Sequence, residues 1–140
     1  MNLVEILQQQ AIDRPDAIAI ATHHQSITFA QLAEAADRAA NFLQRFGLKS
    51  GDAVLIFQPM SINLYIALLA IWRIGMVAMF VDPSAGKDHL DRCCNLYPPQ
   101  GLIASSKAHL LRLRSPALRQ IPHKFAIAPC SRYGIDFQSG

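Results

Sequence analysis

Lysine, histidine and cysteine side chains give this 140-residue sequence several groups that could bind phosphate or metal. Gly86-Lys87 has the form of the end of a phosphate-binding loop. That motif requires a glycine five residues before Gly86 and a serine or threonine after the lysine. Val81 and Asp88 stand at those positions. We therefore reject a phosphate-binding loop at this point of the sequence.

Histidines provide two candidate metal sites. His23-His24 could chelate a metal, but the pair is more typical of a hairpin turn. His89 and Cys93 lie four residues apart on one face of a predicted helix, a spacing that could hold a metal ion. Because no other ligands are in view, we interpret them as a buried cysteine beside a surface histidine. Neither Cys93 nor Cys94 has a recognisable base partner that would make it a nucleophile.

Two further sets of side chains could bind ligands. Lys107 and Arg112 could contact the phosphates of a cofactor such as coenzyme A, but we expect them to be solvated. Tyr65, Trp72 and Phe80 could line an aromatic ligand pocket, but their spacing favours the core between a helix and a sheet. The sequence thus predicts no catalytic, cofactor-binding or metal-binding residue.

The stretch from Gly51 to Pro83 organises the predicted fold. Ala53–Phe57 is short, apolar and β-branched, as a buried strand should be. Ser61 is a good N-cap for the apolar helix that follows, and Gly75 ends that helix. Met76–Val81 is predicted as a second buried strand. Strand, helix and strand in about thirty residues form a βαβ unit, which implies a parallel sheet with helices on both faces.

The segments before this unit predict a small hairpin between two helices. We expect a helix from Asn2 to about Ile12, a strand over Ala17–Ala21 and a short pairing arm at Ser26–Thr28. Thr28 and Gln31 form a capping box that opens a second helix, which runs to Phe46. Its predicted inward stripe is rich in alanine: Leu32, Ala35, Ala36, Ala39, Phe42, Leu43 and Phe46.

The segments after Pro83 continue the α/β pattern. They predict a helix over Lys87–Leu96, a strand over Gly101–Ala104, a short basic helix over Lys107–Leu113, a further strand over Phe125–Ala128 and a frayed end over Tyr133–Gly140. The fold class is therefore α/β, with a mostly parallel sheet, helices on both faces and a small N-terminal hairpin. We expect the sheet to contain strands near residues 17–21, 53–58, 76–81 and 101–104.

Composition indicates one globular domain over residues 1–140, because 51% of the residues are apolar. Three cysteines suit a reduced compartment, and no signal peptide is visible, so we expect a cytoplasmic protein. The mostly apolar stretch Ile62–Val81 is long enough to cross a membrane. Arg73 near its middle and Gly75 after it argue against a membrane span.

The net charge of +3 is unevenly distributed. Residues 1–100 hold seven basic and nine acidic side chains, whereas residues 101–140 hold six basic side chains and one acidic. This basic end could touch nucleic acid or anionic lipid. Because it has no interleaved aromatic residues and no nucleic-acid-binding motif, we interpret it as a solvated face or a face for an acidic partner domain.

The same residues carry a resemblance to a known family. The segments concerned are Gly51-Asp52, Gln58-Pro59-Met60-Ser61, Tyr65–Trp72, Ile74-Gly75-Met76-Val77 and Val81-Asp82-Pro83. Together they resemble the N-terminal domain of adenylate-forming enzymes, which include acyl-CoA synthetases, luciferases and peptide-synthetase adenylation domains. The commoner family wording from residue 74 is Ala-Gly-Ala-Val…Pro-Leu-Asn-Pro. The variant seen here, with Arg92-Cys93 and Lys107-Ala108-His109-Leu110 after it, is most similar to the olefin β-lactone synthetase branch.

This resemblance implies an enzyme that uses ATP and Mg²⁺ to convert a carboxylic acid, for which we expect a fatty acid, into an acyl-adenylate. The family's phosphate-binding Thr-Ser-Gly-Thr-Thr-Gly-x-Pro-Lys motif is absent from these 140 residues. The resemblance covers roughly Leu3 to Leu113, the opening quarter of such an enzyme, and transfers no catalytic residue. We therefore expect an inactive N-terminal fragment that needs no cofactor of its own. Its partner would be the remainder of the synthetase. The alternative is a stand-alone interaction module that associates with itself or a partner through uncovered apolar surface.

Overall fold

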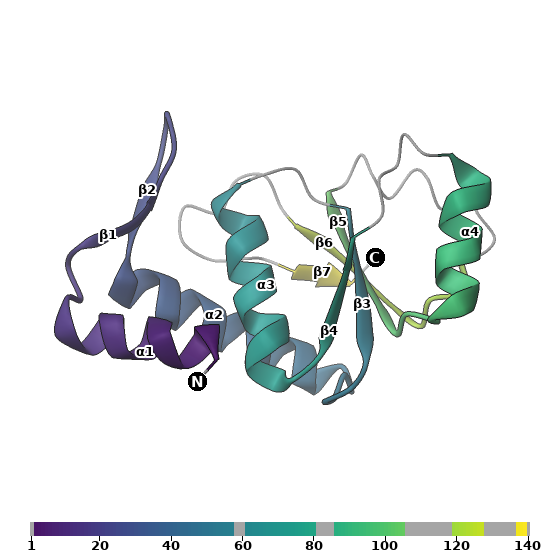
Figure 1. Cartoon of the computed structure of the whole chain (residues 1–140), viewed down its shortest axis with the longest axis horizontal. Coiled ribbons are helices and arrows are strands. Elements are labelled where there is room, and N and C mark those ends of the chain that lie inside the picture. The colour runs from purple at the N-terminus through teal and green to yellow at the C-terminus, as the bar shows by residue number, and fades with distance from the viewer. Residues whose placement is uncertain (1, 58–60, 81–85, 106–118, 128–136, 140) are drawn as a thin grey trace.

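The computed structural model describes residues 2–57, 61–80, 86–105, 119–127 and 137–139 (Figure 1). Helices and strands alternate along most of this chain, as the sequence predicts. In order they are α1 (Leu3–Asp13), β1 (Ile18–Ala21), β2 (Ser26–Thr28), α2 (Phe29–Arg45), β3 (Ala53–Phe57), α3 (Ile62–Ile74), β4 (Val77–Phe80), α4 (Lys87–Leu96), β5 (Gly101–Ser105), β6 (His123–Ile127) and β7 (Phe137–Ser139).

The main sheet has five strands in the order β4-β3-β5-β6-β7. Strands β4, β3, β5 and β6 are parallel to one another, and β7 pairs antiparallel with β6. Ala53 of β3 stands opposite Val77 of β4, and Val54 opposite Gly101 of β5. The predicted βαβ unit is therefore confirmed, and β3 is a central strand whose five residues are all buried.

The strand predicted near residues 17–21 forms, but its expected place in the main sheet is wrong. β1 pairs antiparallel with β2 in a separate two-stranded sheet. The turn at His23-His24 allows β1 to pair with the segment that follows at once. Its first and last residues, Ile18 and Ala21, are exposed, which does not suit a central parallel strand. In the main sheet, β6 supplies the fourth parallel strand instead.

Alternate residues of β3 face two different cores. Val54 and Ile56 contribute to the larger core, which α1, α2 and α3 cover. Leu55 and Phe57 contribute to the smaller core with Leu90 of α4. In Figure 1, α3 and α4 accordingly lie on opposite sides of the strands. Helices cover both faces of the sheet, as the apolar strands predict.

Local signals in the sequence fix the helix ends. The side chain of Thr28 accepts a hydrogen bond from the backbone N–H of Gln31 (3.2 Å), and the Gln31 side chain accepts one from the N–H of Thr28 (3.0 Å). Ser61 caps α3 by accepting from the N–H of Leu64 (3.2 Å). Gly75 ends α3 with φ of +86°, a left-handed conformation that glycine adopts without strain.

Two of the predicted segments differ from the structure. The sequence predicts Met76–Val81 as a buried strand, but β4 is the edge strand of the described sheet, and Val77 and Phe80 expose 43% and 59% of their surface. The sequence predicts a frayed end over Tyr133–Gly140, but Phe137–Ser139 pairs with β6. The predicted helix Lys107–Leu113 falls outside the described residues.

Arg73 lies near the end of α3 and forms an ion pair with Asp37 of α2. This pairing explains a charge within an otherwise apolar segment. The helix itself spans only 13 residues. Among the described helices, none has the length and apolar character that crossing a bilayer would require.

Candidate functional site

The carboxyl ends of the parallel strands form the edge where α/β folds bind ligands. In this chain that edge is reached by Phe57 of β3, Phe80 of β4, Ser105 of β5 and Ile127 of β6. The segments that follow these strands, 58–60, 81–85, 106–118 and 128–136, lie outside the described residues. Lys107 and Arg112, the predicted candidates for phosphate contacts, belong to these segments, as does Cys130.

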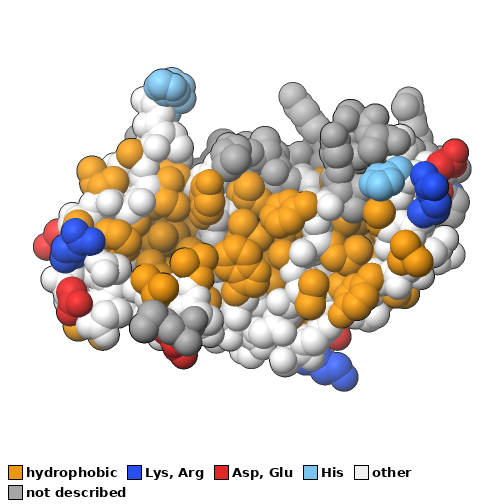
Figure 2. Space-filling view, in the orientation of Figure 1, with side chains coloured by type: hydrophobic (Ala, Val, Ile, Leu, Met, Phe, Trp, Pro, Cys, Tyr) orange, Lys and Arg blue, Asp and Glu red, His pale blue; other side chains and the backbone are white. Residues whose placement is uncertain are grey.

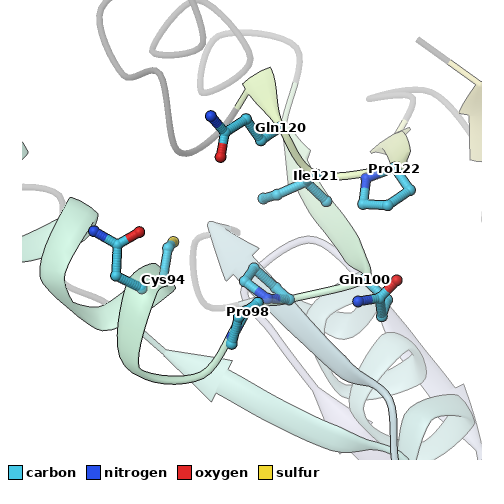
Figure 3. A pocket seen from close by; sticks show the side chains of 8 residues that line it. Cys94, Pro98, Gln100, Gln120, Ile121 and Pro122 are labelled. Atoms are coloured by element: carbon cyan, nitrogen blue, oxygen red, sulfur yellow. The ribbon is translucent and has the colours of Figure 1, made fainter.

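A cavity of about 230 Å³ lies between the end of α4 and the segment before β6 (Figure 3). Cys94 comes from α4, whereas Gln120 and Ile121 precede β6, so residues distant in sequence share its wall. In Figure 3 the Cys94 thiol, the Ile121 side chain and the Pro98 ring surround one space. The cavity borders the starts of β5 and β6. It is therefore at the opposite edge from that expected of a ligand site in this fold.

Among the described residues that line the cavity, none has a charged side chain. Its lining consists of Cys94, Asn95, Pro98, Pro99, Gln100, Gln120, Ile121 and Pro122. Carboxylates and phosphates are usually held by cations or by several backbone N–H groups. The amides and prolines here suit a small neutral molecule better than a nucleotide.

The thiol of Cys94 is a poor nucleophile in this setting. Burial raises its pKa above the usual value, and the neighbouring Cys93 and Asp91 raise it further. The thiolate is the reactive form of cysteine, so a raised pKa leaves Cys94 protonated and unreactive at neutral pH. This agrees with the absence of a recognisable base in the sequence.

His89 and Cys93 meet on one face of α4, as their spacing predicts. The Nε2 atom of His89 and the Sγ atom of Cys93 are 3.7 Å apart. The predicted burial of Cys93 is wrong, because Cys93 is half-buried and its neighbour Cys94 is the buried one. Within the described part of the chain, no group of three histidine, cysteine, aspartate or glutamate side chains could hold a metal ion.

The remaining candidates lie at the surface. His23 and His24 occupy the exposed hairpin turn between β1 and β2, as predicted, with ring centres 6.5 Å apart. Gly86 precedes α4 with φ of +96° and is also exposed. Neither position brings a further ligating side chain near it among the residues described.

Tyr65, Trp72 and Phe80 do not fill the core, contrary to the prediction. They expose 39%, 38% and 59% of their surface. Tyr65 and Trp72 instead line an apolar groove of about 280 Å³, together with side chains of α1, α2 and β1. Helix α3 is apolar around nearly its whole circumference, so spacing alone cannot decide which of its side chains face the sheet.

Hydrophobic side chains gather over α1, α3 and β4 on one side of the molecule (Figure 2). The charged side chains in this view lie at its rim. We call this surface the β4 face. It spans both sides of the β4 edge, because Phe80 lies on the α3 side of the sheet and Val77 on the α4 side. We define it by the exposed residues Leu3, Ile6, Tyr65, Trp72, Val77 and Phe80. The sequence predicts uncovered apolar surface in general terms but does not place it, although the lack of any charge between Gly75 and Val81 is a signal consistent with this location.

Comparison with known proteins identifies the family. A family model described as AMP-binding enzyme matches residues 7–131. Malpibaldin synthetase of Mortierella alpina is 38% identical over 86 residues, which are 61% of this chain and 2% of that protein. A dimodular nonribosomal peptide synthase of Bacillus subtilis is 29% identical over 106 residues, which are 76% of this chain and 4% of that protein. This chain therefore spans only a small part of the length of these relatives.

Solved structures share the fold. The N-terminal subdomain of NpsA from Klebsiella oxytoca is 28% identical with a TM-score of 0.68, over 74% of this chain and 27% of that one. A Rhodopseudomonas palustris protein described as a long-chain-fatty-acid CoA ligase has a TM-score of 0.83 at 20% identity, over 96% of this chain and 34% of that one. The chain therefore belongs to the AMP-binding enzyme family and shares the N-terminal α/β fold of its adenylate-forming members.

Proposed function

We propose that this chain is the N-terminal part of an ATP-dependent ligase that activates a carboxylic acid. In such a reaction the carboxylate attacks the α-phosphate of ATP, forms an acyl-adenylate and releases pyrophosphate. The match of the family model to residues 7–131 carries the proposal. The identity with malpibaldin synthetase supports it. ATP and Mg²⁺ are requirements of the complete enzyme, and we assign no residue of this chain to them.

The role of this lobe in such an enzyme would be architectural. Its parallel strands direct their carboxyl ends, at Phe57, Phe80 and Ser105, toward one edge, where an α/β sheet presents its ligand site. The lobe would supply packing surface and one wall of the acyl site. Because the phosphate-binding motif of the family is absent from these 140 residues, we expect the chain alone to be inactive. The cysteine content supports a cytoplasmic location.

Two classes of acid compete as the substrate of the complete enzyme. The form Val81-Asp82-Pro83 favours a fatty acid, as in the olefin β-lactone synthetase branch. The names of curated relatives, among them the dimodular nonribosomal peptide synthase, favour a building block of a peptide. The likeness to the Rhodopseudomonas protein does not separate them, since 20% identity supports the fold alone.

An ATP–pyrophosphate exchange assay tests this proposal. The purified chain is incubated with ATP, Mg²⁺, labelled pyrophosphate and a panel of fatty acids and amino acids. We expect no exchange above background with any acid. Clear turnover would overturn the proposed inactivity. Reading the DNA downstream then tests the ligase assignment, since an in-frame Thr-Ser-Gly-Thr-Thr-Gly-x-Pro-Lys motif is expected and an immediate stop codon would favour a separate protein.

A second candidate function is a non-catalytic interaction module. The β4 face favours it, because apolar patches of this kind commonly mark protein–protein contact sites. In this case the chain would act by associating with itself or with a partner protein. Sedimentation at several concentrations tests this candidate. Association with rising concentration would support it, and a well-behaved monomer at every concentration would count against it.

A further inference from the structure

Strand β4 has an open outer side. It stands at the end of the strand order, and no strand within the described ranges pairs with it there. The backbone N–H of Val77 donates to the carbonyl of Asp52 (2.9 Å), so Val77 directs its backbone groups toward β3. Because these groups alternate along a strand, Ala78 and Phe80 direct theirs outward. The edge thus offers two residues with backbone donors and acceptors for another strand.

The side chains of β4 do not protect this edge. Natural edge strands commonly carry a lysine, a proline or a β-bulge that discourages pairing with another chain. β4 reads Val-Ala-Met-Phe and pairs with β3 in an uninterrupted register. It therefore has none of these three devices. Its two most exposed side chains, Val77 and Phe80, are apolar.

The pattern of β4 is complementary to itself. If two copies meet antiparallel about a twofold axis through Met79, Ala78 of each stands opposite Phe80 of the other. Both are residues that direct their backbone groups outward, so the two strands can exchange four hydrogen bonds. The same axis places α3 against the second copy's α3. Tyr65 and Trp72 would then be covered by the second copy's α3, and each contact would occur twice, as in an isologous interface.

The β4 face has the apolar area that a stable dimer needs. An aromatic side chain buries about 150–250 Å². At exposures of 38–59%, the three aromatic and three aliphatic side chains of this face leave roughly 400–500 Å² of apolar surface uncovered. A standard interface covers about 800 Å² per partner, about 65% of it apolar in homodimers, or about 500 Å². The charged rim in Figure 2 matches the polar border of such interfaces.

We propose that β4 pairs antiparallel with β4 of a second copy of this chain, so that the two sheets join into one and the two β4 faces cover each other. The dimer depends only on the edge strand and its apolar surroundings. It does not depend on the proposed ligase activity of a longer protein. An exchange assay can therefore fail without affecting this proposal, and the dimer can be absent without affecting the ligase assignment.

Sedimentation velocity over low to high micromolar concentrations tests the dimer. We expect the wild-type chain to approach twice its mass of 15.5 kDa as the concentration rises. Phe80→Lys and Ala78→Pro should each weaken dimerisation at least tenfold. Proline at Ala78 removes an outward N–H, which an edge strand tolerates without losing its inner ladder. The matched control is Ile18→Lys, which adds the same charge at an exposed apolar residue of the separate hairpin and should leave the dimer intact.

Cysteine crosslinking tests the register. In a background with Cys93, Cys94 and Cys130 replaced by alanine, Met79→Cys should form an intermolecular disulfide under mild oxidation. Residues at the axis of a non-hydrogen-bonded pair lie about 4.5 Å apart at Cα, which suits a disulfide. Val77→Cys is the matched control and should not crosslink. Monomer at every concentration, a dimer unaffected by Phe80→Lys and Ala78→Pro, or crosslinking at Val77 in place of Met79 would each overturn the proposal.

Discussion

Two neighbouring cysteines on α4 have different environments, and their reactivity should differ accordingly. Burial raises the pKa of Cys94, and Cys93 and Asp91 raise it further, whereas Cys93 is half-buried. At pH 8 we expect iodoacetamide to modify Cys93 at least tenfold faster than Cys94, because the thiolate is the reacting species. Tandem mass spectrometry of the tryptic fragment that begins at Cys93 distinguishes the two sites and measures both rates. Equal rates would contradict the burial of Cys94.

The same shift makes stability depend on pH in a defined direction. The pKa of the Cys94 thiol is higher in the folded chain than in the unfolded chain. The contribution of this thiol to the free energy of unfolding is fully present while the thiol of the unfolded chain is protonated. It is lost as the pH rises past the unfolded pKa and toward the folded pKa. Between pH 8 and 10, we expect the free energy of unfolding to fall less steeply in Cys94→Ala than in the wild-type chain. Urea titrations at several pH values measure this difference.

Gly75 is the glycine whose replacement we expect to be most informative. Its φ of +86° is left-handed, and an added Cβ would lie 2.8 Å from the Oγ of Ser50. Gly75→Ala should cost about 1–2 kcal/mol of stability from backbone strain alone. Gly47→Ala is a matched control, since it has φ of +92° with no atom within 4 Å of the added Cβ. Urea unfolding measures the loss of stability in both variants. If Gly75→Ala loses more than Gly47→Ala, and a Ser50→Ala background removes the difference, the contact with Ser50 is its cause.

At the scale of elements, the cap of α2 offers a direct test of a signal read in the sequence. Thr28 accepts from the N–H of Gln31, and Gln31 accepts in return from Thr28. Thr28→Ala should destabilise the chain by about 1 kcal/mol, because an N–H of the first helical turn loses its acceptor. Thr28→Ser retains the hydroxyl and should stay close to wild type. Similar losses for both variants in thermal unfolding would show that packing of the Thr28 methyl dominates.

The elements also show which features could be predicted from the sequence. Helix ends at Thr28, Ser61 and Gly75 were predictable because a cap depends on residues within one turn. The exposure of β4 was not predictable, because it depends on which strands lie beside β4. The hairpin itself was predicted, but its strand Ile18–Ala21 was expected in the main sheet for the same reason. The cavity at Cys94 and Ile121 also escaped prediction, since neutral residues brought together from distant segments form no motif.

At the scale of the whole molecule, β3 joins the two cores into one cooperative unit. Val54 and Ile56 pack beneath α2 and α3, whereas Leu55 packs on the side of α4. Unfolding either side would expose one face of the same five buried residues. We therefore expect a single urea transition observed equally by far-UV circular dichroism and by the fluorescence of Trp72.

Matched truncations in the two cores test this cooperativity. Ile71 of α3 lies in the larger core and Leu90 of α4 in the smaller one. Ile71→Ala and Leu90→Ala should each lower the free energy of unfolding by about 2–5 kcal/mol, with an unchanged m-value and nearly additive effects in the double variant. If Leu90→Ala instead produced a separate early transition without changing the Trp72 signal, α4 and its core would unfold independently. The unit held by β3 would then extend no further than the three N-terminal helices.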